Sequence, residues 1–113
     1  MIKIISKRIS PEKLKEFLGK PFSDMVKFVV DIEKGVVALG GELHSDAEAL
    51  LLEKGCLQKN LWGGNLYPDL PGEGRIVYTS MINIRPSAGN RSMELKDEKA
   101  RARVKIVLDK LIL

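Results

Sequence analysis

Residues 26–40 read VKFVVDIEKGVVALG, and this stretch decides the fold of the chain. In residues 26–32, apolar side chains alternate with mostly polar ones, which is the period of a strand with one buried face. A tight turn at residues 33–35 follows, and Gly35 stands at the position of the turn that requires a positive φ. Residues 36–40 then have the composition of a second strand. Because the turn is too short for a crossover, the stretch predicts an antiparallel hairpin.

The segments on either side of this hairpin add further elements. Residues 2–6 are a β-branched run typical of a first strand. Ser10 followed by Pro11 predicts the start of a short helix, with the serine as N-cap and the proline in the first turn. Residues 61–67 and 75–85 are predicted to be strands, and the second of these is expected to be the longest in the chain.

Two longer helices are also predicted. Ser45 and Glu48 have the spacing of a capping box, which predicts a helix that begins there and ends at Gly55. Asp97 is the expected N-cap of a C-terminal helix. The side chains of this last helix that should face the core are Ala100, Val104, Val107, Leu108 and Leu111.

These elements predict an α+β protein, a single domain over residues 1–113. We expect a small, mainly antiparallel sheet of four to five strands, packed by two or three helices that include the C-terminal one. The hydrophobic fraction of 44% and the charged fraction of 30% are those of a folded domain and not of a disordered chain. The length of 113 residues also falls within the usual size of one domain.

The cysteine content and the apolar runs indicate a cellular compartment. Cys56 is the only cysteine, which excludes an internal disulfide and a zinc cluster built from cysteines of one chain. A reducing compartment is therefore the simpler interpretation. No apolar run approaches the roughly 20 residues of a membrane span, and the N-terminal apolar stretch is too short for a signal peptide. We therefore expect a cytoplasmic protein with no membrane partner.

Charge is unevenly distributed along the chain, whose net charge is +4. Residues 1–40 hold eight basic and five acidic side chains, residues 41–74 hold two and six, and residues 75–113 hold nine and four. A basic C-terminal third suits nucleic acid or an anionic ligand. The structural alternative is that these charges pair with the acidic middle segment or are simply solvated.

Residues 40–48, GGELHSDAE, are the first of two unusually polar segments. If this segment stays extended, Glu42, His44 and Asp46 project on one side. A histidine between two carboxylates suits acid–base chemistry, and it also suits a divalent metal held mainly by oxygen ligands. The structural alternative is that the acidic residues complement the dipole of the following helix and take part in its cap. Capping needs neither Glu42 nor His44, so we predict these two as catalytic residues and Asp46 as a ligand contact. We predict no metal site.

Residues 83–92, NIRPSAGNRS, are the second polar segment. Arginine presents a rigid fork of donors that matches carboxylate or phosphate, and asparagine adds a donor and an acceptor. Asn83, Arg85, Asn90 and Arg91 are therefore the predicted contacts to an anionic ligand. The alternative is that the arginines pair with the acidic segment, for instance with Glu42 or Asp46, and tie a loop to the sheet.

Three strings carry a resemblance to a known family: GGELHSDAEALLLEKG at residues 40–55, WGGNLYP at 62–68 and INIRPSAGNRSME at 82–94. With them, nearly the whole chain resembles a family of small prokaryotic proteins known only as a domain of unknown function. The resemblance implies a single domain but no activity, substrate or cofactor. In that family serine often stands where this chain has Cys56, which weakens a catalytic role for the thiol. The resemblance draws attention to Glu42, His44, Asp46, Glu48, Trp62, Asn65, Asn83, Arg85, Asn90 and Arg91.

The leading functional hypothesis is a small enzyme or ligand-binding protein for an anionic small molecule, in which the arginines and asparagines hold the anion beside the Glu42–His44 pair. Whether it is an enzyme is left open, and no cofactor is identified, since no nucleotide-binding fingerprint is present. One alternative is a nucleic-acid-binding module that uses the basic C-terminal third, although no recognised motif appears. Another is a structural or partner-binding homodimer without a catalytic site. These hypotheses differ in whether the two polar segments meet in space around a cleft.

Overall fold

The predicted hairpin lies at the centre of the sheet. In the computed structural model, which describes residues 1–113, β2 (Val26–Asp31) and β3 (Val36–Gly40) pair antiparallel. The turn between them is held by Asp31, whose buried Oδ1 accepts the N–H groups of Glu33 and Lys34 at 2.9 Å each. Gly35 has φ +67°, which suits a residue without a Cβ. The hairpin prediction is confirmed.

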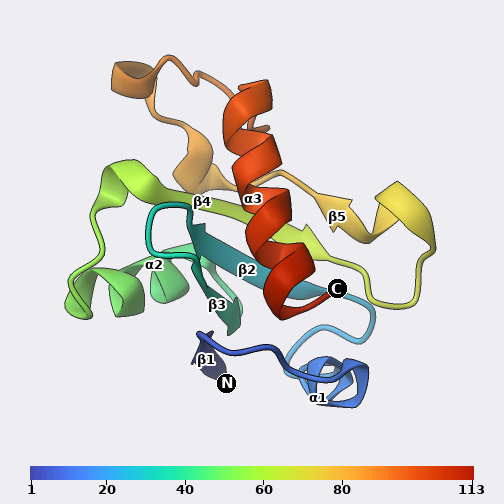
Figure 1. Cartoon of the computed structure of the whole chain (residues 1–113). Coiled ribbons are helices and arrows are strands. Elements are labelled where there is room, and N and C mark those ends of the chain that lie inside the picture. Colours follow the sequence, from blue (N-terminus) through green and yellow to red (C-terminus); the bar gives the residue numbers. More distant parts are fainter.

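Three further strands complete a five-stranded sheet, shown in Figure 1. They are β1 (Ile2–Ile5), β4 (Leu61–Leu66) and β5 (Ile76–Val77). The strand order is β1-β3-β2-β4-β5, and every neighbouring pair is antiparallel. The predicted fold class, α+β with a small antiparallel sheet, is confirmed.

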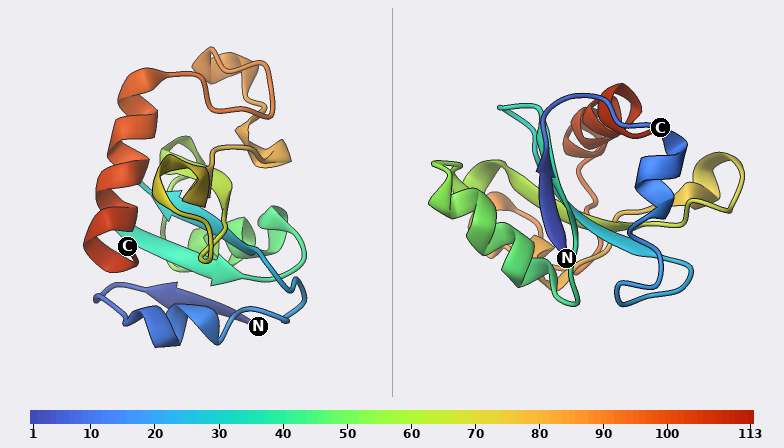
Figure 2. Two further views of the ribbon diagram at one scale, coloured as in Figure 1. Left: turned by 90° about the vertical axis from the view of Figure 1, so that its right-hand side faces the viewer. Right: turned by 90° about the horizontal axis from the view of Figure 1, so that it is seen from below.

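The helices cover both faces of this sheet. They are α1 (Pro11–Lys15), α2 (His44–Glu53) and α3 (Glu98–Leu111). In the right panel of Figure 2, α2 lies on one side of the sheet and α3 on the other. The larger apolar core lies on the α3 side, and a smaller one lies between α2 and the sheet. No helix is long and apolar enough to cross a membrane.

Both predicted N-caps outside α2 are present. Ser10 accepts the N–H of Lys13 at 3.1 Å, and Asp97 accepts that of Lys99 at 2.9 Å. The predicted inward face of α3 is confirmed as well, because the five side chains predicted to face the core are all buried: Ala100, Val104, Val107, Leu108 and Leu111. Local sequence signals therefore predict where α1 and α3 begin and which face of α3 is buried.

The prediction of a long strand over residues 75–85 is wrong. β5 ends at Val77, and a 3₁₀ turn occupies Met81–Asn83. The chain leaves β4 because residues 78–80 pair with a later segment: Leu95 N–H donates to Tyr78 O and Ser80 N–H donates to Met93 O. Ser80 Oγ then accepts the N–H of Ile82 at 3.2 Å, which starts the turn. Asn83 and Arg85 consequently share no strand face.

The predicted capping box of α2 is also absent. The N-cap of the helix is Leu43, two residues before the predicted Ser45, and it makes no side-chain capping bond, so the helix begins at His44. The buried face of α2 consists of His44, Ala47 and Leu51, at helical spacing. Burying that face outweighs a capping bond worth about 1 kcal/mol, so tertiary packing sets where the helix starts. As a result, residues 42–46 are not an extended segment with Glu42, His44 and Asp46 on one side.

Candidate functional site

A cavity of about 330 Å³ lies where the start of α2 meets β2 and β4. Lys27 of β2 and Asn65 of β4, which are partners across the two strands, contribute to it from the sheet. The remaining walls come from residues 42–45 at the start of α2, residues 79–82 after β5, and Met93. Five separate stretches of the sequence therefore build one small site.

His44 is the central polar group of this cavity. The residue is only 9% exposed, and its Nε2 lies 2.7 Å from the carbonyl oxygen of Gly64. Because a carbonyl can only accept a hydrogen bond, the proton of the neutral ring is on Nε2. The other nitrogen, Nδ1, then carries a lone pair, and the bond to Gly64 O is the only hydrogen bond of ordinary length and angle that the ring makes. A backbone bond on one ring nitrogen that leaves the other free is an arrangement suited to a general base.

Glycine at position 63 allows His44 and Ser80 to approach the sheet closely. A Cβ at this position would lie 2.9 Å from Ser80 Oγ and 3.2 Å from Cδ2 of the His44 ring. The ring therefore approaches Gly63 with Cδ2, next to the Nε2 that binds Gly64 O. No hydrogen bond joins Ser80 to either ring nitrogen, and Ser80 Oγ already accepts from Ile82. Ser80 and His44 thus do not form a nucleophile–base pair.

The electrostatics of the site keep His44 neutral. Burial lowers the pKa of His44 below its usual 6.5, and the charge of Lys27 lowers it further, while the Gly64 carbonyl and the side chain of Asn65 act in the opposite direction. Burial also lowers the pKa of Lys27. Near pH 7 the cavity therefore contains an uncharged imidazole beside an ammonium group.

Two side chains from the sheet are left with unused binding capacity. Lys27 takes part in no ion pair of the structure, and its Nζ lies 5.3 Å from the ring centroid of Phe22. Asn65 Nδ2 donates a long hydrogen bond of 3.5 Å to Thr79 O, while its Oδ1 is buried without a partner. A buried acceptor without a partner costs about 1–3 kcal/mol, which a donor from a bound molecule would offset.

Among the predicted site residues, Glu42 and His44 line this cavity together. Glu42 is exposed at its edge. Asp46 is exposed too, but it lies in a neighbouring open cleft of about 540 Å³, which Glu42 shares with it. No group of three or more histidine, cysteine, aspartate or glutamate side chains lies close enough to hold a metal ion. The predicted acid–base pair is thus at one site, whereas Asp46 is beside it.

Asn83 uses its side chain to bind the open edge of β4. Its amide accepts the N–H of Gly63 and donates to Gly63 O, both at 2.9 Å, so it takes the place of a neighbouring strand. It also donates to Met93 O at 3.1 Å. Every hydrogen bond here is to backbone, and the side chain is fully buried. The structure therefore gives Asn83 a role in holding the sheet edge.

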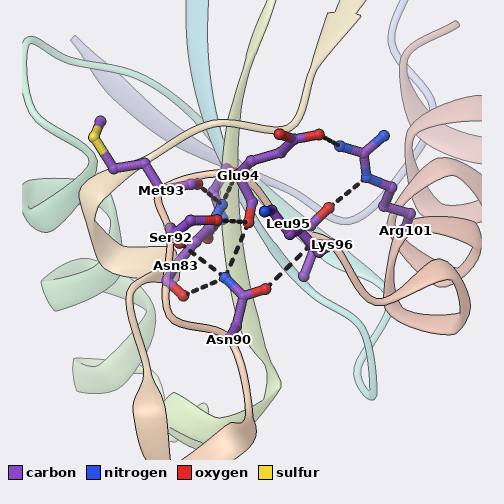
Figure 3. Close-up of polar contacts among 9 residues, drawn as sticks. Asn83, Asn90, Ser92, Met93, Glu94, Leu95, Lys96 and Arg101 are labelled. Atoms are coloured by element: carbon purple, nitrogen blue, oxygen red, sulfur yellow. Dashed lines mark hydrogen bonds and ion pairs between the residues drawn. The ribbon is translucent and has the colours of Figure 1, made fainter.

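Asn90 organises the loop that follows, as Figure 3 shows. Its Nδ2 lies within hydrogen-bonding distance of the carbonyl oxygens of Asn83, Ser92 and Glu94, at 2.8–3.1 Å. Its Oδ1 accepts the N–H of Lys96 at 3.1 Å. The side chain is 5% exposed and is surrounded by backbone groups of its own loop. That Asn83 and Asn90 bind a ligand stays a prediction, and their amides are already engaged.

The two arginines of this segment differ. Arg85 stacks over Trp62, with its Cζ 4.4 Å from the ring centroid, and Nη2 donates to Leu61 O at 2.8 Å. Burial lowers the pKa of Arg85, and the charge of Glu48 partly offsets this. Arg91 is exposed and makes no hydrogen bond or ion pair. Neither arginine forms an ion pair with Glu42 or Asp46, so Arg85 ties the loop to the sheet through a carbonyl and an aromatic ring instead.

The two polar segments meet only in part. Residues 42–45 and 79–82 surround the His44 cavity, and Glu48 lies near enough to influence Arg85. Asn83, Arg85, Asn90 and Arg91 do not line the cavity. Sequence reasoning missed Lys27 and the role of Asn65. Two features of the sequence could have identified them. Lys27 is a charged side chain within an apolar strand of the hairpin, and the Gly63-Gly64 pair before Asn65 marks a close approach to the sheet.

Cys56 lies away from this site, in the smaller core beside Asp31. Burial raises the pKa of the Cys56 thiol to about 11, and Asp31 contributes to the rise. Since only the thiolate is reactive, we expect native Cys56 at pH 8 to react with iodoacetamide about 100-fold more slowly than Cys56 in the urea-unfolded chain. Labelling followed by mass spectrometry measures both rates. Equal rates in the native and unfolded chain would contradict this.

The comparisons with known proteins give one match. The family model DUF5674, described as a protein of unknown function, matches residues 3–111. No curated protein and no solved structure matches the chain.

Proposed function

The chain therefore belongs to the DUF5674 family, whose function is unknown, and we propose that it binds a small anionic molecule in the His44 cavity, with His44 as a general base. The observation that carries the proposal is the orientation of the His44 ring. Its Nε2 is bound to the Gly64 carbonyl, which leaves the Nδ1 lone pair for a hydroxyl, an N–H group or a water of the ligand.

Lys27 supplies the positive charge in the cavity, which is why we propose an anionic ligand. It lines the same cavity, has no carboxylate partner and is partly desolvated, which strengthens its attraction for a negative group. The buried Oδ1 of Asn65 accepts a donor from the same ligand. We therefore assign the anion contact to Lys27, because the amides of Asn83 and Asn90 are bonded to backbone groups and Arg85 lies outside this cavity.

Glu42 completes the predicted acid–base pair. It lines the cavity next to His44 and is exposed, so it suits the exchange of a proton between the histidine and bulk water. The ligand that fits these groups is a small anion that also carries a hydroxyl or N–H donor. Its size is bounded by the cavity volume of about 330 Å³, at the lower end of small-molecule sites.

The basic C-terminal third offers less support for nucleic acid. Three of its cations lie in ion pairs with carboxylates: Arg101 with Glu94, Arg103 with Glu33, and Lys105 with Asp109. Pairing of this kind reduces the free positive charge that counterion release requires. Nucleic-acid binding and homodimer formation stay predictions.

The titration of His44 tests the proposed function. It is the only histidine, so its ring signals in an NMR spectrum are unambiguous. Without ligand the midpoint should lie below pH 6.5, because burial disfavours the imidazolium. Millimolar inorganic phosphate should raise the midpoint, since an anion favours the protonated ring, and should shift the amide signals of residues 42–45 and 79–82.

Variants at two lysines make the test specific. Lys27→Met should raise the midpoint of ligand-free His44, because a neighbouring positive charge is removed, and should weaken phosphate binding about tenfold or more. Lys59→Met, at an exposed lysine outside the cavity, is the matched control and should change neither quantity. If phosphate leaves the His44 titration and the amide signals unchanged, the proposed function is wrong.

A further inference from the structure

Three exposed apolar side chains stand at the mouth of the His44 cavity. Leu43 is 58% exposed, Met81 71% and Met93 43%, and all three line the cavity. They come from the N-cap of α2, the 3₁₀ turn after Ser80 and the Asn90 loop, so no single amphipathic element accounts for them. Scattered apolar side chains on a surface are ordinary, but these three line one cavity, and we call them its apolar rim.

The backbone holds these side chains in place. Met93 O accepts bonds from Asn83 Nδ2 and from Ser80 N, at 3.1 and 3.0 Å. Figure 3 shows the Met93 side chain extending away from this hydrogen-bonded cluster. The carbonyl oxygens of Leu43 and Met81 are also bound, by the N–H groups of Asp46 and Ile84. The rim is therefore a built feature of the loops, although each methionine side chain can adapt its shape to what it contacts.

The cavity consequently has two ends of different chemistry. Lys27, Asn65 and His44 provide a cation, an amide and an imidazole where the sheet forms its floor, while Leu43, Met81 and Met93 provide apolar surface at its mouth. An inorganic anion would use only the first end and would leave the rim in water. A molecule that covers the rim removes its apolar surface from water, which is favourable in proportion to the area buried.

We propose that the ligand is amphipathic: an anionic head bound at Lys27 and His44, joined to an apolar body that packs on Leu43, Met81 and Met93. This inference rests on the proposed function, because it uses the same cavity and the same head-group contacts. The volume of about 330 Å³ limits the body to a single ring or a short chain. The ligand class is an aryl or short alkyl phosphate or carboxylate, with the polar end toward the sheet.

The experiment compares two probes with the same head, inorganic phosphate and phenyl phosphate. Their dissociation constants are measured from amide shifts of residues 42–45 and 79–82. Phenyl phosphate should bind at least about tenfold more tightly, as expected if its ring buries apolar area against the rim. The double variant Met81→Ser/Met93→Ser should remove most of this advantage and leave the affinity for inorganic phosphate unchanged.

Ile106→Ser is the matched control, because Ile106 is a 64% exposed apolar side chain on α3, outside the cavity. It should change neither affinity. All three positions in these variants are exposed, so thermal unfolding should stay at the wild-type temperature. If phosphate binds in a Lys27-dependent way but phenyl phosphate is no tighter, or the double variant keeps the advantage, the apolar body is refuted while the proposed function stands. If neither probe binds, both are refuted.

Discussion

Replacement of Asn83 by alanine should lower the free energy of unfolding by about 4 kcal/mol. The fully buried amide accepts from Gly63 N, donates to Gly63 O and donates to Met93 O. Alanine leaves the N–H and the carbonyl of Gly63 without a partner, and each such group costs about 1–3 kcal/mol when buried. Met93 O loses one of its two hydrogen bonds and keeps the one from Ser80 N–H. The free edge of β4 then also loses its link to the loop that carries Met93.

Urea unfolding followed by circular dichroism measures this loss. Asn83→Asp keeps the acceptor but loses both donated bonds and buries a charge, so it should also be strongly destabilised. Ser87→Ala in the same loop is the control, since Ser87 is exposed and makes no hydrogen bond, and it should change stability by no more than about 0.5 kcal/mol. A loss under about 1 kcal/mol for Asn83→Ala would show that water can replace the amide.

Gly64→Ala should destabilise the fold by about 3 kcal/mol. A Cβ at this position would lie 2.5 Å from Cζ of the Phe28 ring and 2.5 Å from the backbone oxygen of Val77. Phe28 is fully buried, and the Val77 oxygen belongs to β5, so neither can move without disturbing the core or the edge of the sheet. Overpacking of this kind costs about 1–3 kcal/mol and sometimes more.

Gly74→Ala is the matched control for this change. Its Cβ would meet nothing closer than Leu70 Cδ1 at 4.0 Å, and its φ lies outside the left-handed region. The same urea experiment should therefore find no more than about 0.5 kcal/mol of difference from wild type. Similar losses for the two alanine variants would mean that the effect arises from chain entropy and not from the contact with Phe28 and Val77.

The cavity could be predicted from the sequence only in part. Glu42 and His44 were identified because a helix cap needs neither of them, and both line the cavity. Lys27 was overlooked because a lysine within a strand is ordinarily a solvated residue. Ligand contacts were also predicted at Asn83, Arg85 and Asn90. A sequence does not show whether an amide or a guanidinium group will bind a ligand or an unpaired backbone group of its own chain.

Several elements can be predicted from local signals in the sequence alone. The central hairpin, the Ser10 and Asp97 caps and the buried face of α3 all depend on residues within one or two turns of each other. Capping, turn geometry and side-chain periodicity act over that range, so they can be read without knowing the fold.

The start of α2 and the path of residues 78–95 depend instead on contacts between distant parts of the chain. His44 joins the helix because its ring packs on Gly63 and binds Gly64, about 20 positions away. The chain leaves the sheet after β5 because residues 93–95 and the amide of Asn83 satisfy backbone groups that a longer strand would have paired. These outcomes depend on which distant backbone groups remain unpaired once the sheet has formed, and no local pattern in the sequence encodes that.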